Sequence, residues 1–231
     1  MERKAQNMAL EFSKPGRLEN LVWRPVEEIS EIPEHGLEIE VMATGLNFRD
    51  IMLTMGLLPD DAVENGFARA NLGLEFSGRV VRVGAGVTDF VPGDRVAGFG
   101  KSCFASKVLT GDYCVARIPD TVSFESAATL PVVFFTAWYA LKHLANIQPG
   151  ERLLIHGAAG GLGMAAIQIA RHLGAEVFAT AGSDEKRDFL ALSGVTHVYN
   201  SRDCSFVNEI LADTKGEGID VVINSLAGEA M

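Results

Sequence analysis

Three glycines, Gly157, Gly160 and Gly163, stand at a spacing that can serve phosphate chemistry. They follow the short apolar run 153–155, which suits a strand buried on both faces, and they precede an apolar helix pattern over 164–173. Glycine has no Cβ to hold the backbone away from a diphosphate, and the start of a helix offers free N–H groups and its positive end. Strand, glycine turn and helix in this order predict a dinucleotide-binding turn. The alternative is a purely structural strand–helix turn, which uses the same residues.

The strand that follows this helix ends without an acidic residue before Asp184. An NAD site places Asp or Glu there to hold the ribose diol, whereas an NADP site has neutral and basic groups. Ser183, Lys186 and Arg202 could jointly hold a 2′-phosphate through charge-assisted hydrogen bonds. The pattern favours NADPH, the alternative being that Lys186 and Arg187 form a solvated helix face.

A second polar group lies nearer the N-terminus, where Asn47, Arg49 and Asp50 stand among apolar neighbours. This pattern indicates a short helix that enters a cleft. The alternative is that Asn47 and Asp50 only cap that helix.

The sequence gives little support for a catalytic metal site or for a serine nucleophile. The five histidines and three cysteines show no grouping of the sort that catalytic zinc needs, so no metal site is predicted. Only His156, at the end of the first strand, lies near the predicted cofactor turn. The stretch 73–78 superficially resembles a serine elbow around Ser77, but it lacks the glycine two positions before the serine and the strand-to-helix setting.

Two kinds of architecture are needed to position these residues. Up to about Pro119, short strands separated by turns about 8–12 residues apart indicate an all-β unit, with a loop over 57–72. A helix opened by Ser123 and a longer apolar helix over 131–147 follow. Beyond Pro149 strands and helices alternate, which implies a parallel sheet with right-handed crossovers.

The predicted domains are 1–128, β-rich, and 129–231, nucleotide-binding. Four strands of the parallel sheet are visible, whereas a doubly wound nucleotide domain normally has six, so the chain is expected to be truncated before the last strands. Their omission would expose a sheet edge, with a hazard of aggregation or partner pairing.

Charge, hydropathy and cysteine content limit which binding partners and which cellular compartment are expected. The net charge of −10 argues against a nucleic-acid interface, which needs a basic face. No apolar run approaches the roughly 20 residues of a membrane span, the longest being 130–141. The N-terminus lacks a signal peptide's apolar segment, and three distant cysteines suit a reducing compartment. A cytoplasmic protein is expected.

The sequence resembles the medium-chain dehydrogenase/reductase superfamily, and more closely the enoyl reductase domain of type I polyketide synthases and animal-type fatty acid synthases. The resemblance covers nearly the whole chain and is carried by 46–50 (LNFRD), 92–96 (PGDRV), 128–134 (ATLPVVF), 156–166 (HGAAGGLGMAA) and 221–229 (VVINSLAGE). Zinc-bearing members carry a histidine after the glycine at the position of Gly73, where this chain has Leu74. The resemblance implies a GroES-like β-rich domain, a Rossmann-type domain and the zinc-free branch.

The resemblance also implies a reaction. A trans-2-enoyl thioester carried on acyl carrier protein would accept a hydride from NADPH at Cβ, and protonation at Cα would follow. The protein would then have to position the reactants and stabilise the developing enolate charge. Neighbouring synthase domains are expected partners, and a homodimer is compatible with the sequence.

Site residues follow from the matched motifs. Asn47 and Thr136 would lie near the nicotinamide and its phosphate arm, and Asn224, Ser225 and Leu226 would flank the nicotinamide. The diphosphate would be held by the turn residues Gly157, Ala159, Gly160, Gly161, Leu162 and Gly163. The 2′-phosphate would be held by Ser183, Lys186 and Arg202.

Two departures leave the proton donor unnamed. Many relatives carry a tyrosine at the position of Met52, and methionine cannot supply a proton. The family's Gly-Lys motif would come after Asn224, and the sequence ends at Met231 before it. Asn47, Met52 and Asn224 are therefore candidates only for lining the active site. A freestanding quinone or enone oxidoreductase and a cofactor-binding fragment without turnover are the alternative functions.

Overall fold

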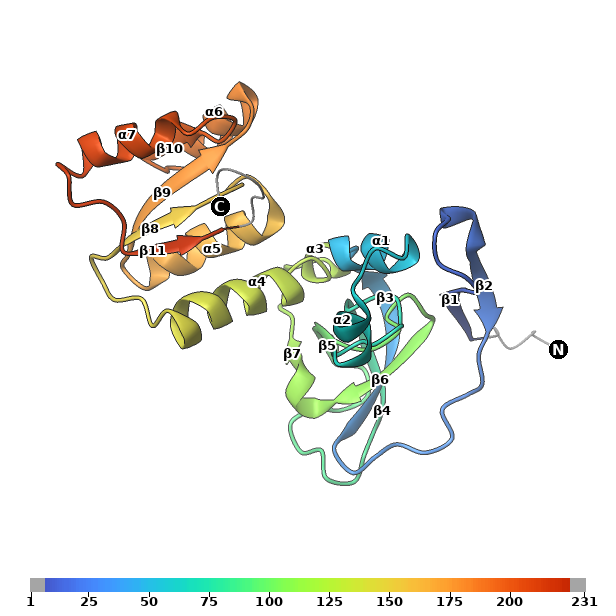
Figure 1. The fold of residues 1–231 in the computed structure, drawn as a ribbon. Coiled ribbons are helices and arrows are strands. Elements are labelled where there is room, and N and C mark those ends of the chain that lie inside the picture. Colours follow the sequence, from blue (N-terminus) through green and yellow to red (C-terminus); the bar gives the residue numbers. More distant parts are fainter. Residues whose placement is uncertain (1–6, 225–231) are drawn as a thin grey trace. The chain divides into compact units, whose positions relative to one another are not determined.

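The computed structural model describes residues 7–224 and divides the chain into two compact units, Met1–Val132 and Val133–Met231 (Figure 1). We call them the N-terminal and the C-terminal unit.

The N-terminal unit is built around a five-stranded antiparallel sheet with the strand order β6-β3-β4-β5-β7. Its strands are β3 (Gly36–Thr44), β4 (Glu75–Val83), β5 (Arg95–Phe99), β6 (Lys107–Gly111) and β7 (Val115–Arg117). A separate hairpin pairs β1 (Met8–Phe12) with β2 (Leu21–Pro25). The core packs Leu37 and Ile39 of β3 against Phe76 and Val80 of β4. The predicted β-rich unit is confirmed.

Short helices lie between these strands and after the last of them. They are α1 (Phe48–Thr54), α2 (Asp60–Glu64) and α3 (Phe124–Ala127), with 3₁₀ turns at Leu18–Asn20 and Asp112–Cys114. The prediction of a loop over 57–72 was wrong at α2. Pro59 precedes that helix and two acids occupy its first turn, where the positive end of the helix favours them. As predicted, the hydroxyl of Ser123 caps α3 by accepting a hydrogen bond from the Ser126 N–H at 3.1 Å.

The C-terminal unit holds a parallel sheet with the strand order β10-β9-β8-β11. The strands are β8 (Arg152–Ile155), β9 (Glu176–Ala181), β10 (His197–Asn200) and β11 (Val221–Ile223). The helices are α5 (Gly161–His172), α6 (Asp184–Leu192) and α7 (Ser205–Asp213), together with α4 (Pro131–Trp138), whose first two residues belong to the N-terminal unit. Because the chain runs from β8 outward on one side and returns to β11 on the other, the sheet has a topological switch point between β8 and β11. The predicted alternation and parallel sheet are confirmed.

Both faces of this sheet are covered. Leu153 and Ile155 of β8 pack in one cluster with residues of α5 and with Leu190 of α6. Leu154 points to the opposite face and packs in a second cluster with Phe206 of α7. Burial on both faces explains why the run 153–155 is apolar without alternation.

The helix predicted over 131–147 is not one regular helix. After α4 the chain continues as a π-helix, η3 (Tyr139–Leu144), in which the Ala140 carbonyl accepts a hydrogen bond from the Ala145 N–H at 2.9 Å. An apolar pattern this short does not distinguish the wider turn from an α-helical one, which is why the sequence prediction missed it.

One helical stretch within residues 7–224, Phe124–Leu144, is long and apolar enough by length and composition to cross a membrane. The sequence prediction, which counted only the most apolar run, did not find it. Helices of water-soluble domains can reach the same length and composition. Here the stretch includes α3, α4 and η3 and buries Ala127, Ala128, Ala137 and Leu141.

Candidate active site

In the glycine turn after β8, the absence of side chains lets backbone segments approach one another closely. Gly157 has a φ of +62°, a conformation that favours glycine. The Ala158 N–H donates to the Thr180 carbonyl oxygen at 3.0 Å, which fixes the turn to β9. A Cβ on Gly163 would lie 2.4 Å from the Ala158 carbonyl oxygen, so only glycine allows α5 to approach the turn this closely.

The N-terminus of α5 has no side-chain cap. Its N-cap residue is Gly160, whereas Ser183 caps α6 with its hydroxyl. The first N–H groups of a helix have no partner within the helix, so those of Gly161, Leu162 and Gly163 are placed to bind an anion. Gly160 and Gly161 are exposed, and Ala159 and Leu162 are half-buried. A diphosphate therefore fits this turn by the chemistry of its donors.

The end of β9 brings two of the three predicted 2′-phosphate residues together. The guanidinium Nε of Arg202 donates to the Gly182 carbonyl oxygen at 3.2 Å, beside Ser183. A Cβ on Gly182 would lie 2.7 Å from the same Nε, so the missing side chain makes room for the guanidinium. Lys186 is exposed in the first turn of α6.

Arg187 differs from the solvated helix face considered from the sequence. It is half-buried, it donates to the Ala181 carbonyl oxygen at 3.1 Å, and it forms an ion pair with Asp184. The carboxylate of Asp184 is therefore occupied by a cation from its own helix.

Asn224 directly follows β11 and is exposed. The His156 N–H donates to the Ile223 carbonyl oxygen at 3.0 Å. Asn224 and the glycine turn therefore lie together at the carboxyl ends of β11 and β8. Ser225 and Leu226 lie outside the described residues. Thr136 is exposed on α4.

In the N-terminal unit, Asn47 opens α1 and forms a capping box with Asp50. The Asn47 N–H donates to Asp50 Oδ2 at 3.0 Å, and the Gly73 N–H donates to Asp50 Oδ1 at 2.8 Å. Asp50 is buried, and it does more than cap α1, because its second carboxylate oxygen binds the Gly73 N–H outside that helix. Met52 is half-buried on the same helix.

The sequence analysis did not identify Glu75. This residue begins β4 and is 3% exposed. Its Oε1 accepts a hydrogen bond from Asn47 Nδ2 at 2.8 Å, and its Oε2 accepts one from the Val132 N–H at 2.8 Å. Burial raises the pKa of Glu75, and the bonds from Val132 and Asn47 oppose that shift. An acidic residue directly before Phe76, at the buried start of the strand, is the signal that could have pointed to it.

Two other candidates have structural roles. Ser77 lies in β4 and its hydroxyl donates to the Phe124 carbonyl oxygen at 2.6 Å, which is not the setting of a nucleophile. His156 is buried, with Nδ1 2.9 Å from Thr180 Oγ1, and burial lowers its pKa. Among residues 7–224, no group of three or more His, Cys, Asp or Glu side chains could hold a metal ion.

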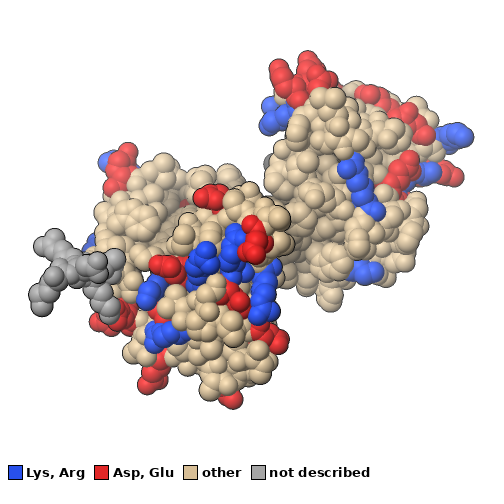
Figure 2. Space-filling model, turned by 180° about the vertical axis from the view of Figure 1, so that it is seen from behind, with Lys and Arg blue, Asp and Glu red and all other residues tan. Residues whose placement is uncertain are grey.

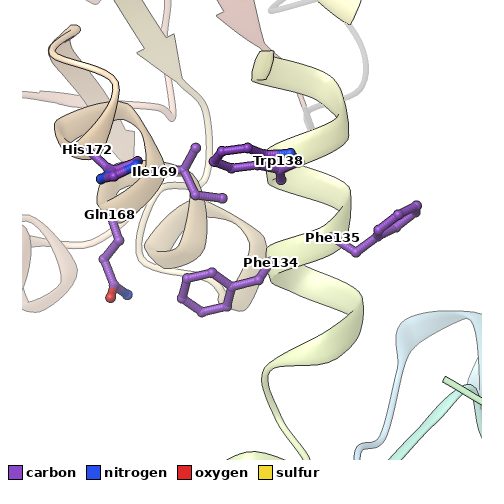
Figure 3. Close-up of a pocket in the computed structure, with 6 residues that line it drawn as sticks. All are labelled: Phe134, Phe135, Trp138, Gln168, Ile169 and His172. Atoms are coloured by element: carbon purple, nitrogen blue, oxygen red, sulfur yellow. The ribbon is translucent and has the colours of Figure 1, made fainter. Parts of the chain in front are cut away.

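A groove of about 460 Å³ lies along the flank of the C-terminal unit, between α4 and α5 (Figure 3). It is lined by Phe134, Phe135, Trp138, Gln168, Ile169 and His172. The residues from α5 belong to its C-terminal half, so the groove is separate from the glycine turn at the other end of that helix.

Surface charge is mixed in sign. On the face shown in Figure 2, the N-terminal unit carries Lys and Arg side chains with Asp and Glu side chains among them. The ion pairs in that unit include Arg117 with Asp94 at 2.8 Å and Arg95 with Asp120 at 3.2 Å.

Two protein families match parts of the chain. "Alcohol dehydrogenase GroES-like domain" matches residues 33–134, and "Zinc-binding dehydrogenase" matches residues 161–231. Their order along the chain is that of the two units.

Among characterised proteins, the highly reducing polyketide synthase ZEA2 of Gibberella zeae is 44% identical over 228 residues. The match covers 97% of this chain and 9% of that synthase. The chain thus spans only a small part of the length of the synthases that it matches.

Two solved structures extend the comparison to both units. The CurK enoyl reductase has a TM-score of 0.91 at 44% identity, over 97% of this chain and 69% of that one. The Escherichia coli quinone oxidoreductase, solved in complex with NADPH, has a TM-score of 0.78 at 32% identity, over 96% of this chain and 67% of that one.

Proposed function

The chain belongs to the enoyl reductases of the medium-chain dehydrogenase/reductase superfamily, and we propose that it reduces trans-2-enoyl thioesters on acyl carrier protein with NADPH. The product is the saturated acyl thioester. In this proposal the chain acts as the enoyl reductase of a polyketide or fatty acid synthase, in the cytoplasm, next to the other domains of the synthase. Its occurrence as a homodimer is part of the same proposal.

The observation that carries the proposal is the uncapped N-terminus of α5 beside the switch point of the sheet. Three consecutive backbone N–H groups there have no partner within the helix, and the exposed residues Gly160 and Gly161 place no side chain over them. Nucleotides bind outside the carboxyl ends of parallel strands at such switch points. A related oxidoreductase has been solved with NADPH.

The end of β9 supports NADPH over NADH. The last residues of β9 and the two residues after it, Gly182 and Ser183, carry no carboxylate, and Asp184 at the start of α6 is paired with Arg187. Ser183 and Arg202 offer a hydroxyl and a guanidinium at the position where a 2′-phosphate would need them. Lys186, exposed in the first turn of α6, would add a second cation.

Bound at this turn, the reduced nicotinamide would supply the hydride. The conjugated thioester carbonyl already makes Cβ electrophilic, so the residues of the chain have to orient the reactants and stabilise charge on the thioester oxygen. We assign the orienting role to Asn47 and Asn224, whose amides can donate and accept hydrogen bonds. Met52 cannot supply the proton for Cα, so water or another group supplies it.

The test is the oxidation of NADPH, followed by its absorbance, with crotonyl thioester and with a small quinone as substrates. Turnover of the thioester in clear preference to the quinone supports the proposal. Preference for the quinone selects a quinone or enone oxidoreductase, and binding of NADPH without turnover of either selects a cofactor-binding domain. Titration of NADPH and NADH by fluorescence tests the cofactor, and equal affinity contradicts the role of Ser183, Lys186 and Arg202.

A further inference from the structure

Glu75 is a buried carboxylate that is held entirely by neutral donors. Its two oxygens accept hydrogen bonds from Asn47 Nδ2 and from the Val132 N–H, each at 2.8 Å. The ion pairs formed by residues 7–224 do not include Glu75. By contrast, Glu38 on the neighbouring strand is 1% exposed and is paired with both Arg82 and Lys107.

Burying a carboxylate without a cation is costly, and the cost is reduced only when both oxygens are hydrogen-bonded. An apolar residue at this position of β4 would avoid that cost. The carboxylate therefore needs another physical reason, and its contacts indicate one.

The reason lies in the orientation of the Asn47 amide. An ionised carboxylate only accepts hydrogen bonds, so the amide nitrogen of Asn47, and not its oxygen, must face Glu75. Away from Glu75, the Asn47 side chain takes part in the capping box at the start of α1. The backbone beside it is tight as well, because a Cβ on Gly45 would lie 2.3 Å from Glu75 Oε1.

We propose that Glu75 is a positioning residue that locks the Asn47 amide so that its second N–H is offered to a carbonyl oxygen in the active site. This inference rests on the proposed function, in which Asn47 contacts the reactants. The acceptor is either the carboxamide oxygen of the nicotinamide or the thioester oxygen of the substrate. Both acceptors are carbonyl oxygens, and they are distinguished by whether the Kd of NADPH or the kcat changes.

The variant Glu75→Gln keeps the shape of the side chain and replaces one acceptor by an NH₂ donor. That NH₂ must face either Asn47 Nδ2 or the Val132 N–H, so one donor loses its acceptor. Glu38→Gln is the matched control, since it removes an equally buried carboxylate of the same sheet. Glu75→Asp is the second variant, which keeps the charge but shortens the reach, for use if Glu75→Gln does not fold.

We expect Glu75→Gln to weaken NADPH binding or to lower kcat by about 10- to 100-fold, as small misplacements of positioning groups do. A rise in the Kd of NADPH identifies the nicotinamide oxygen as the acceptor, and a fall in kcat with unchanged Kd identifies the thioester oxygen. Glu38→Gln should leave both within about twofold of the wild type, as expected of changes that act only on stability. In an Asn47→Ala background, Glu75→Gln should have no further effect on either quantity.

A readout independent of turnover is the NMR signal of the Asn47 side-chain amide, assigned by its loss in Asn47→Ala. It should be protected from solvent exchange in the wild type and in Glu38→Gln, and lose that protection in Glu75→Gln. An unchanged signal in Glu75→Gln overturns the proposed contact. A changed signal with kcat and Kd equal to those of Glu38→Gln means that Glu75 is only structural. If the wild type neither binds NADPH nor turns over thioester, the proposed function fails, and with it the role of Asn47, whatever the NMR signal does.

Discussion

Arg202 lies against Gly182, its guanidinium Nε donating to the glycine carbonyl oxygen at 3.2 Å. This contact holds a cation beside the last residues of β9, although the two residues belong to different loops. In the proposed site, the Arg202 guanidinium is the cation that binds the 2′-phosphate.

Arg202→Ala should weaken NADPH binding by roughly 10- to 100-fold, since a hydrogen bond to a charged group contributes about 1.5–3 kcal/mol. NADH, which has no 2′-phosphate, should bind as before. Fluorescence titration with both cofactors measures the difference. Arg171→Ala is the control, because Arg171 also donates to a carbonyl oxygen, that of Ser193 at 3.0 Å, elsewhere in the same unit. An equal loss for both cofactors in Arg202→Ala would contradict the assignment.

Gly163→Ala should destabilise the protein by about 1–3 kcal/mol, the usual cost of forcing extra volume into a packed contact. The added Cβ would lie 2.4 Å from the Ala158 carbonyl oxygen, so the turn or α5 must shift. Gly160→Ala is the matched change, because its φ of −86° suits alanine and its Cβ would lie 3.3 Å from the Gly157 carbonyl oxygen. Denaturant unfolding of the two variants gives the comparison, and equal stabilities would show that the close approach is not needed.

Lowering the pH should cost stability through His156. Burial lowers the pKa of this histidine, so below its ordinary pKa of about 6.5 the unfolded chain binds a proton that the folded chain does not. Stability should therefore fall as the pH drops from about 6.5 toward the lowered pKa, by at most about 1.4 kcal/mol per pH unit. Unfolding free energies from pH 8 to pH 5 test this, with a smaller slope expected for His156→Gln. His143→Gln, which changes an exposed histidine, is the control. An unchanged slope in His156→Gln would mean that other groups cause the loss.

Ser77→Ala should lower stability by about 1 kcal/mol, because it removes the hydrogen bond to the Phe124 carbonyl oxygen. Turnover per folded molecule should stay unchanged, since the hydroxyl takes part in no chemical step. Steady-state kinetics together with thermal unfolding separate the two effects. A loss of kcat in a fully folded variant would reopen the question of a nucleophile in β4.

The parts of the fold and site that the sequence predicted depend on neighbours along the chain. The run 153–155, the glycine spacing from Gly157 and the cap at Ser123 are local patterns whose physical meaning changes little with context. The contact between Asn47 and Glu75 is different, because it joins the end of one loop to the start of a distant strand. No spacing rule predicts such a pair, which arises because the sheet pairs the end of β3 with the start of β4, as at Thr44 and Phe76. The π-helix at 139–144 was missed for another reason, since its pattern is too short to distinguish helical periods.

The strand order of the C-terminal unit also has a consequence for how this unit folds. β8 pairs with β9 through residues such as Arg152 and Glu176, which are separated by one helix. It pairs with β11 through residues such as Leu153 and Val221, which are separated by three helices and two strands. Closing the longer loop costs more entropy, so the parallel β8–α5–β9 unit should form first and β11 should dock last. Pulse-labelled hydrogen exchange during refolding should find the amides between β8 and β9 protected before those of β11. The edge that carries Asn224 would then be the last part of the proposed site to assemble.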